Sequence, residues 1–138
     1  SIPEFLADKE QLIQVVLNIT RNAMQALQPH REKARAGAKI TLKTRTIRQF
    51  TIGHTRHRLV LHLSIIDNGP GIPEAIRESL FYPMVSGRAD GTGLGLSIAQ
   101  SIINQHQGII ECDSESGRTE FSIYLPLELN LDDYQKRY

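Results

Sequence analysis

Four β-rich segments, grouped in two pairs, constrain the fold of this chain more than any other feature of its sequence. In each segment apolar side chains alternate with polar ones or form a short buried run, which is typical of strands. The segments are residues 39–47, 59–66, 109–113 and 119–125. Because members of a pair lie close together in the sequence, we expect each pair to form an antiparallel hairpin.

The two connections support this hairpin reading. Residues 48–58, with Gly53 at their centre, are short enough to join the first pair, and this places His54 and His57 at the hairpin tip. Residues 114–118 contain a glycine and are predicted to be the second hairpin turn.

Helical periodicity surrounds and separates the strand pairs. Asp8, with a glutamine three residues later, resembles a capping box, and apolar residues then recur at helical spacing until the helix ends near Pro29. A second long helix is predicted from Gly93 until just before Gly108, and a short one over residues 73–79.

Helices segregated in the chain from a mostly antiparallel sheet favour the α/β (α+β) class, as a two-layer sandwich of one sheet and its helices. We expect a single domain over residues 1–126, followed by a polar C-terminal tail at residues 127–138.

Composition excludes several classes of protein. With 138 residues, 40% of them hydrophobic and 22% charged, the chain is neither disordered nor fibrous. No stretch approaches the ~18 consecutive apolar residues of a membrane span, so no membrane partner is expected. The single cysteine, Cys112, cannot form an internal disulfide, which favours the cytoplasm.

Charge is unevenly distributed along the chain. The net charge of +1 does not indicate nucleic-acid binding. Residues 31–58, however, contain nine lysines and arginines and only one glutamate. This basic segment could bind an anionic partner, although a solvated rim is the commoner meaning of such a run.

The first helix carries a polar stripe made of amides and one guanidinium instead of the usual lysine and glutamate. Its members are Gln11, Gln14, Asn18, Arg21, Asn22 and Gln25. Asn18 and Asn22 are one turn apart, and asparagine is unfavourable inside a helix. Their amides either bond to neighbouring loops or supply oxygen ligands to Mg²⁺ and the phosphates it carries.

Asp67 ends an apolar strand and stands immediately before a turn that contains Gly69 and Gly71. A carboxylate here either accepts the backbone bonds of an Asx-turn or binds an exocyclic amine. Adenine offers such an amine where guanine has a carbonyl, so Asp67 could select between the purines.

The glycine-rich run at residues 91–96 opens the second long helix. It is neither a Walker A loop nor a dinucleotide fingerprint, but a glycine-rich turn at a helix N-terminus is suited to bind an anion. Upstream, residues 85–90 resemble a flap, in which Arg88 is either a phosphate contact or a solvated arginine.

Four motifs in this order resemble the N, G1, F and G2 boxes of sensor histidine kinase catalytic domains. They are Asn-Ile-Thr-Arg-Asn-Ala at 18–23, Asp-Asn-Gly-Pro-Gly-Ile at 67–72, Phe-Tyr-Pro-Met at 81–84 and Gly-Thr-Gly-Leu-Gly-Leu at 91–96. The segment 117–126 is similar to the closing strand motif of that family. Within the family, residues 82–88 and 43–46 are most similar to the nitrogen-regulation sensor kinases.

The resemblance implies a Bergerat-type ATP-binding sandwich, of the kind shared with gyrase B, Hsp90 and MutL, that uses ATP and Mg²⁺. It assigns the metal to Asn22, the adenine amine to Asp67 and the lid around the phosphates to three glycines. The further nucleotide contacts that it implies are Asn18, Gly69, Gly71, Ile72, Arg88, Gly91, Thr92, Gly93, Leu94, Gly95, Leu96 and Thr119.

The resemblance also implies a mechanism in which Asn18 and Asn22 are the catalytic positions. Related ATPases place a glutamate at the position of Asn18, and because asparagine cannot act as a base, we expect poor hydrolysis and transfer to a protein histidine instead. None of the five histidines lies in a phosphoacceptor motif, so this chain is expected to bind ATP without phosphorylating itself. Gln25 and Ala26 depart from the lysine and aromatic residue that many members have.

The partners implied are the protein's own dimerisation and histidine phosphotransfer domain, an NtrC-like response regulator and a PII-type signal protein. An alternative hypothesis is a regulatory module, set by nucleotide, that docks the PII-type protein and controls phosphatase activity; the flap and the basic hairpin are its candidate surfaces. An independent ATPase is a third hypothesis, which Asn18 disfavours.

Overall fold

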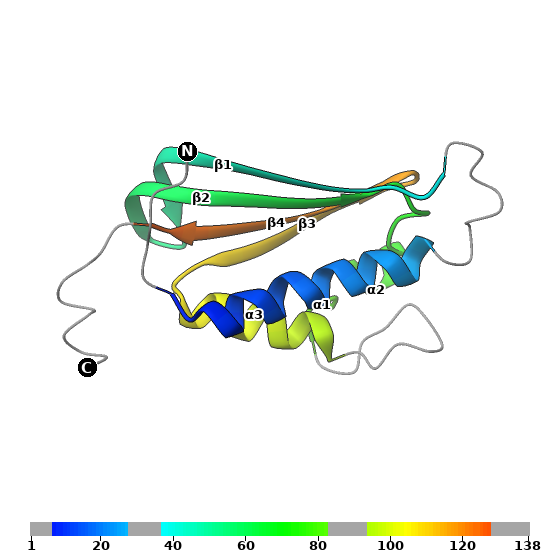
Figure 1. The fold of residues 1–138 in the computed structure, drawn as a ribbon, viewed down its shortest axis with the longest axis horizontal. Coiled ribbons are helices and arrows are strands. Elements are labelled where there is room, and N and C mark those ends of the chain that lie inside the picture. Colours follow the sequence, from blue (N-terminus) through cyan, green and yellow to red (C-terminus); the bar gives the residue numbers. More distant parts are fainter. Residues whose placement is uncertain (1–6, 28–36, 83–93, 128–138) are drawn as a thin grey trace.

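The four predicted strands form one sheet in the computed structural model, which describes residues 7–27, 37–82 and 94–127. The strands are β1 (Ile40–Ile52), β2 (Thr55–Asp67), β3 (Ile109–Glu115) and β4 (Arg118–Pro126). They lie in the order β1-β2-β4-β3, and each neighbouring pair is antiparallel. The helices α1 (Lys9–Leu27) and α3 (Gly95–Gln105) lie side by side against one face of this sheet, and the single turn α2 (Glu74–Arg77) follows β2 (Figure 1).

The predicted two-layer α/β sandwich is therefore confirmed, with its core between the sheet and the two long helices. The most deeply buried side chains of this core come from both layers: Val15, Ile19, Ile65, Ile103, Phe121 and Ile123. None of the helices in the described part of the chain is long and apolar enough to cross a membrane. Of the predicted C-terminal tail, residues 128–138 lie outside the described residues.

Both long helices are held at their ends by bonds that the sequence partly predicts. Asp8 caps α1, because its Oδ1 accepts a hydrogen bond of 3.0 Å from the backbone N–H of Gln11. His106 then links the two helices: its Nε2 accepts from the Asp8 N–H at 3.1 Å, and its Nδ1 donates to the Ile102 carbonyl at 2.8 Å. The start of α1 is thereby fixed to the end of α3.

The first hairpin differs from the prediction. Strands β1 and β2 extend almost to the tip, and only Gly53 and His54 form the turn, with a φ of +62° at Gly53. His54 is at the tip as predicted, but the placement of His57 there was wrong, because it pairs with Phe50 inside the ladder and is buried. The charged residues of this stretch suggest a loop in the sequence, yet an edge strand tolerates them because they point into solvent.

The second hairpin is also tighter than predicted. Its turn consists of two residues at 116–117, so Ser114 belongs to β3 and not to the turn. Gly117 has a φ of +88°, a conformation that glycine adopts without steric cost.

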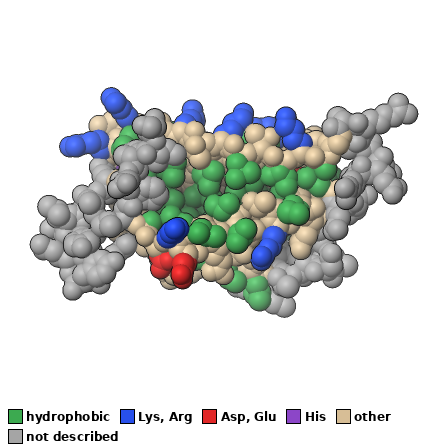
Figure 2. Space-filling model, in the orientation of Figure 1, with side chains coloured by type: hydrophobic (Ala, Val, Ile, Leu, Met, Phe, Trp, Pro, Cys, Tyr) green, Lys and Arg blue, Asp and Glu red, His purple; other side chains and the backbone are tan. Residues whose placement is uncertain are grey.

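Basic side chains line the β1 side of the molecule, above a band of hydrophobic side chains (Figure 2). The β1–β2 hairpin supplies exposed lysines and arginines at positions 43, 45, 48, 56 and 58. Such charges on an edge strand oppose pairing with another sheet.

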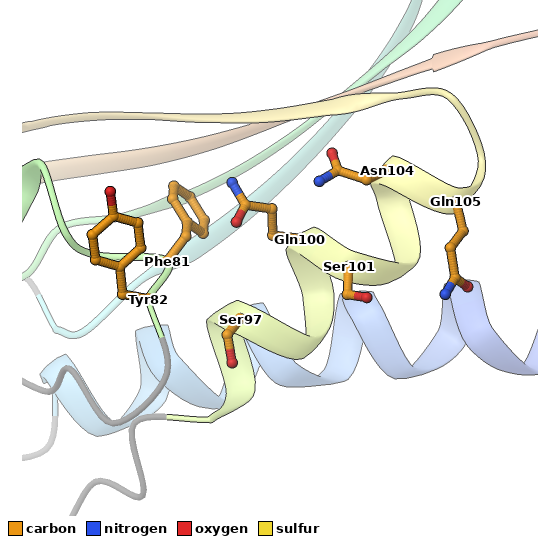
Figure 3. A pocket seen from close by; sticks show the side chains of 7 residues that line it. All are labelled: Phe81, Tyr82, Ser97, Gln100, Ser101, Asn104 and Gln105. Atoms are coloured by element: carbon orange, nitrogen blue, oxygen red, sulfur yellow. The ribbon is translucent and has the colours of Figure 1, made fainter.

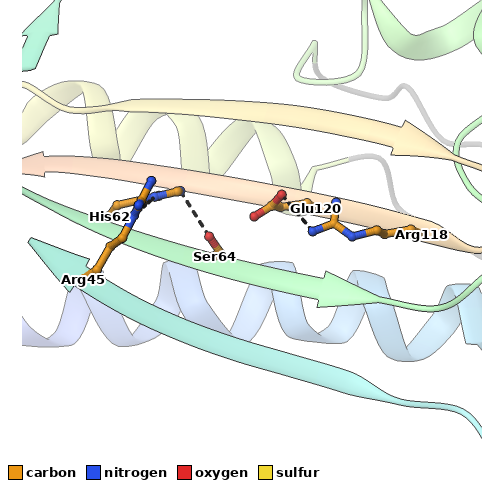
Figure 4. Close-up of polar contacts among 5 residues, drawn as sticks. All are labelled: Arg45, His62, Ser64, Arg118 and Glu120. Carbon is orange, nitrogen blue, oxygen red and sulfur yellow. Dashed lines mark hydrogen bonds and ion pairs between the residues drawn. The ribbon is translucent and has the colours of Figure 1, made fainter. Parts of the chain in front are cut away.

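The sheet face opposite the helices carries a small aromatic and polar cluster. Tyr124 stacks on Phe50 and on His62, with ring centroids 4.7 and 4.4 Å apart. Arg45 donates through Nε to His62 Nδ1 at 3.3 Å, so the proton of the neutral ring is on Nε2, which lies 3.1 Å from Ser64 Oγ (Figure 4). On the same sheet Arg118 and Glu120 form an exposed ion pair (Figure 4).

Candidate functional site

The polar stripe of α1 is attached to the beginning of α3. Asn18 Nδ2 donates a hydrogen bond of 3.2 Å to the Gly95 carbonyl, so its Oδ1 is the amide atom not used in this bond. Asn22 lies one turn further along α1 and is half-buried, whereas Arg21 and Gln25 are exposed. Asn18 therefore bonds to the first residue of a helix and not to a loop, and its role as a ligand through Oδ1 stays a prediction.

Asp67 is 3% exposed at the end of β2, where the turn that follows folds back over it. Its Oδ1 accepts a hydrogen bond of 2.9 Å from the Gly69 N–H. A side chain at Gly69 would place its Cβ 2.8 Å from that same oxygen, so any other residue would have to displace the carboxylate. The predicted Asx-turn is thus present, and a carboxylate can accept more than one hydrogen bond.

The neighbouring Asn68 fixes the turn to the start of β1. Its Oδ1 accepts from the Lys39 N–H at 2.9 Å, and its Nδ2 donates to the Gly37 carbonyl at 3.1 Å. The loop that follows β2 is therefore held on the β1 side by side-chain bonds.

The tip of the β3–β4 hairpin holds the other side of this loop. The Gly117 N–H donates to the Gly69 carbonyl at 3.0 Å. Gly71 has a φ of +89°, and a Cβ there would lie 2.7 Å from the Glu115 carbonyl oxygen. The Ile72 N–H donates to Ser114 Oγ at 2.8 Å. The loop passes so close to the hairpin that its backbone has no room for a side chain at Gly71.

Thr119 connects this hairpin to Asp67. It is 4% exposed, lies directly opposite Asp67 in the β2–β4 register, and has its Oγ1 3.0 Å from Ser114 Oγ. The sequence predicted Thr119 as a site residue but missed Ser114. The signal that was missed is the alternation along β3. Ile110, Cys112 and Ser114 lie on the same face of the strand, and Ser114 places a hydroxyl where an apolar side chain is expected.

The glycine-rich motif is described only from Leu94 onward. Leu94 is 41% exposed, Gly95 begins α3, and Leu96 packs in the hydrophobic core at 9% exposure, so Leu96 can offer a ligand only its backbone. The predicted contacts Arg88, Gly91, Thr92 and Gly93 lie outside the described residues.

Helix α1 brings these parts into one arrangement. Asn18 bonds to the start of α3, and two turns later Ala26 and Leu27 pack near Gly69. Asn22 therefore lies between the first turn of α3 and the loop that follows Asp67. One boundary of the arrangement offers helix N–H groups and amides, and the other offers a buried carboxylate and hydroxyls. A ligand with an anionic end and an amine-bearing end matches that polarity.

The donor set fits a metal that arrives with a ligand. Among the described residues no group of three or more histidine, cysteine, aspartate or glutamate side chains could hold a metal ion. Amide oxygens at Asn22 and Asn18 are suitable for Mg²⁺, which commonly takes few protein ligands and completes its shell with phosphate oxygens and water.

A separate cavity of about 500 Å³ lies on the outward side of α3. Phe81 and Tyr82 face polar side chains of α3 across it (Figure 3). The α3 residues are Ser97, Gln100, Ser101, Asn104 and Gln105. Of the predicted nucleotide contacts that lie among the described residues, none lines this cavity.

Comparison with known proteins shows which proteins this chain resembles. The family model described as "Histidine kinase-, DNA gyrase B-, and HSP90-like ATPase" matches residues 7–129. The chain is 55% identical over 127 residues to the sensory histidine kinase/phosphatase NtrB of Klebsiella oxytoca, and 42% identical over 132 residues to that of Rhodobacter capsulatus. Each match covers 92% of this chain but only 35% of the relative, so the chain spans about a third of the length of these relatives.

Solved structures give the same result. The catalytic domain of the histidine kinase ThkA superposes with a TM-score of 0.68 at 28% identity, covering 89% of this chain and 70% of that one. The mycobacterial sensor histidine kinase MprB has the same fold, with a TM-score of 0.68 at 24% identity over 88% of this chain and 76% of that one.

Proposed function

Because this chain belongs to the histidine kinase-, DNA gyrase B- and HSP90-like ATPase family, we propose that it is the ATP-binding catalytic domain of an NtrB-like sensor histidine kinase. The observation that carries this proposal is the position of Asn18 and Asn22 between the start of α3 and the loop that follows Asp67. The domain donates the γ-phosphoryl group of ATP to a histidine on a separate dimerisation domain.

The base is held at the end of β2. Asp67 accepts a hydrogen bond from the exocyclic amine of adenine, and the bond from the Gly69 N–H to its Oδ1 orients the carboxylate for this role. Guanine would set a carbonyl against the carboxylate at the same place, and two acceptors repel each other. Thr119, opposite Asp67, offers a buried hydroxyl to the same edge of the base.

The phosphates extend from there toward the first turn of α3. The N–H groups and the positive dipole end of this helix start favour phosphate, and we expect Gly91, Gly93 and Gly95 to contribute to its binding. Asn22, with Asn18 beside it, would hold Mg²⁺, and the bound ion would neutralise charge on the phosphate oxygens.

Phosphoryl transfer needs positioning more than covalent help from this chain. The histidine nitrogen of the acceptor attacks the γ-phosphorus, the bond to the β–γ bridging oxygen breaks, and ADP leaves. Asn18 has no basic group to activate water, and its Nδ2 is already engaged with the Gly95 carbonyl, so hydrolysis by the domain alone stays slow.

The partners belong to the same proposal, supported by the similarity to NtrB. They are the protein's own dimerisation and histidine phosphotransfer domain, an NtrC-like response regulator and a PII-type signal protein. The relatives are named kinase/phosphatase, and we extend both activities to the full-length protein, which we assign to the cytoplasm.

Equilibrium binding of ATP, ADP and GTP, with and without Mg²⁺, tests the nucleotide site. We expect ATP and ADP to bind, GTP to bind at least about tenfold more weakly, and Mg²⁺ to strengthen ATP binding. Asp67→Asn should abolish the preference for adenine, with the exposed Asp113→Asn as the matched control. Equal affinity of the parent for ATP and GTP would contradict the role of Asp67.

Two further variants separate metal binding from folding. Asn22→Ala should reduce the effect of Mg²⁺ on ATP binding, whereas Gln14→Ala, at an exposed position of the same helix, should not. Radiolabelled ATP mixed with this chain should phosphorylate a separately supplied dimerisation domain and not the chain itself. Steady phosphate release by the isolated chain would instead support an independent ATPase.

A further inference from the structure

We propose that Ser114 is a positioning residue for the adenine end of the site, although no motif of the sequence includes it. This inference rests on the proposed function and deepens it. Ser114 is at the end of β3, in contact with the loop that follows Asp67 and with Thr119. Its hydroxyl is the side-chain link between the loop and Thr119.

The first contact fixes the backbone of the loop. The Ile72 N–H donates to Ser114 Oγ at 2.8 Å, and without that oxygen the N–H would lose its acceptor in a half-buried place. Gly71, the preceding residue, lies close to the same strand, because a Cβ added there would be 3.2 Å from Ser114 Oγ and 2.7 Å from the Glu115 carbonyl oxygen. The loop therefore follows the surface of β3 closely at two successive residues.

The second contact fixes the rotamer of Thr119. Ser114 Oγ and Thr119 Oγ1 are 3.0 Å apart, and one hydroxyl donates to the other. Because Thr119 lies opposite Asp67, this bond orients the hydroxyl that shares the adenine edge with the carboxylate. Ser114 thus sets the loop and the threonine at once, and it touches neither the base nor the phosphates in the proposed site.

Removal of the hydroxyl should weaken recognition of the base without unfolding the domain. We expect Ser114→Ala to lower the affinities for ATP and for adenosine by the same factor of about ten, equivalent to about 1.4 kcal/mol. The equal factor follows because the defect is confined to the base end, which both ligands share. Ser114→Thr retains the hydroxyl and should recover most of the affinity, and Ser116→Ala, in the exposed turn nearby, is the matched control.

Amide hydrogen exchange gives a readout that does not need a ligand. In Ser114→Ala the Ile72 amide should exchange at least about tenfold faster than in the parent, while core amides such as that of Ile123 keep their rates. A purely structural role would lower the midpoint of unfolding but leave the adenosine affinity at 25 °C unchanged.

The outcomes separate this inference from the proposed function. If the parent binds ATP, and Ser114→Ala binds both ATP and adenosine as tightly as the parent does, then Ser114 is not a positioning residue. The proposed function stands in that case. Loss in Ser114→Ala without recovery in Ser114→Thr also overturns the role of the hydroxyl. If the parent binds no adenine ligand under any condition, both the function and this inference fail.

Discussion

Gly71 and Gly117 form a matched pair that tests how closely the loop must approach the β3–β4 hairpin. Their φ angles are +89° and +88°, so alanine meets the same backbone penalty at both positions. Their surroundings differ, because a Cβ at Gly117 has no atom within 4 Å, whereas one at Gly71 would lie 2.7 Å from the Glu115 carbonyl oxygen. The difference between the two alanine variants therefore isolates the close approach.

The expected magnitudes follow from these geometries. Left-handed backbone costs alanine roughly 1–2 kcal/mol, so Gly117→Ala should lower the free energy of unfolding by about that amount. Gly71→Ala has the same backbone penalty, and it must also move the loop away from Glu115. That movement breaks the hydrogen bond between Ile72 and Ser114, which lowers the free energy of unfolding by about 1 kcal/mol more. At about 4 °C per kcal/mol, the two melting midpoints should differ by about 4 °C.

Function should separate the variants more clearly than stability. Urea denaturation gives the free energy of unfolding, and calorimetric titration with ATP gives the affinity. We expect Gly117→Ala to bind ATP as the parent does, and Gly71→Ala to bind it at least about tenfold more weakly. Equal stability and equal ATP affinity in the two variants would refute the argument that the loop is held in place by its contact with the hairpin.

Three other predictions concern the remainder of the domain. Burial raises the pKa of the Cys112 thiol to about 12. At pH 8, N-ethylmaleimide should therefore modify the folded chain at least about a hundredfold more slowly than the chain unfolded in urea. Equal rates of modification would contradict the burial of this thiol. Burial and the Arg45 guanidinium lower the pKa of His62 from its usual 6.5. As the pH falls, the unfolded chain therefore binds a proton at His62 before the folded chain does, and the free energy of unfolding should decrease below pH 6.5. Urea titrations between pH 7 and 5 should show a smaller loss in His62→Gln. Phe121→Ala should lower the free energy of unfolding by about 3–5 kcal/mol, because Phe121 is 1% exposed and packs edge-on against Phe81. A loss below about 1 kcal/mol would contradict that packing.

The helices were predictable because their signals are local. The cap at Asp8 follows from the capping-box pattern, and the buried positions Val15, Ile19 and Ala23 follow from helical spacing. The length of the first hairpin was not predictable in the same way. Residues 48–58 mix arginines and polar residues with Phe50, Ile52 and Gly53, without a clear strand pattern. They are extended because β1 and β2 pair across the ladder almost to the tip of the hairpin.

The candidate site was predictable residue by residue but not as an arrangement. Asp67 and Thr119 are far apart in the sequence, and they meet only because β2 pairs with β4 in one register. Ser114 was missed because a glycine-containing segment between two strands favours a turn, and the turn rules gave it a local role. Its actual partner, Ile72, is 42 residues away, and no local rule reaches that distance.

The two ends of the proposed site are built differently, and this bears on how the domain would tell ATP from ADP. At the base end, backbone and side-chain bonds tie the loop after Asp67 both to the start of β1 and to the β3–β4 hairpin, and a change there should alter the affinities for ATP, ADP and adenosine together. At the phosphate end, Asn18 of α1 donates a hydrogen bond to the Gly95 carbonyl at the start of α3. Because only this end can sense the γ-phosphate, a variant that changes the ratio of the ATP and ADP affinities should map to α1 or to the start of α3 and not to the hairpin. Asn18→Ala and Ser114→Ala make that comparison directly, since the first should change the ratio and the second should leave it constant.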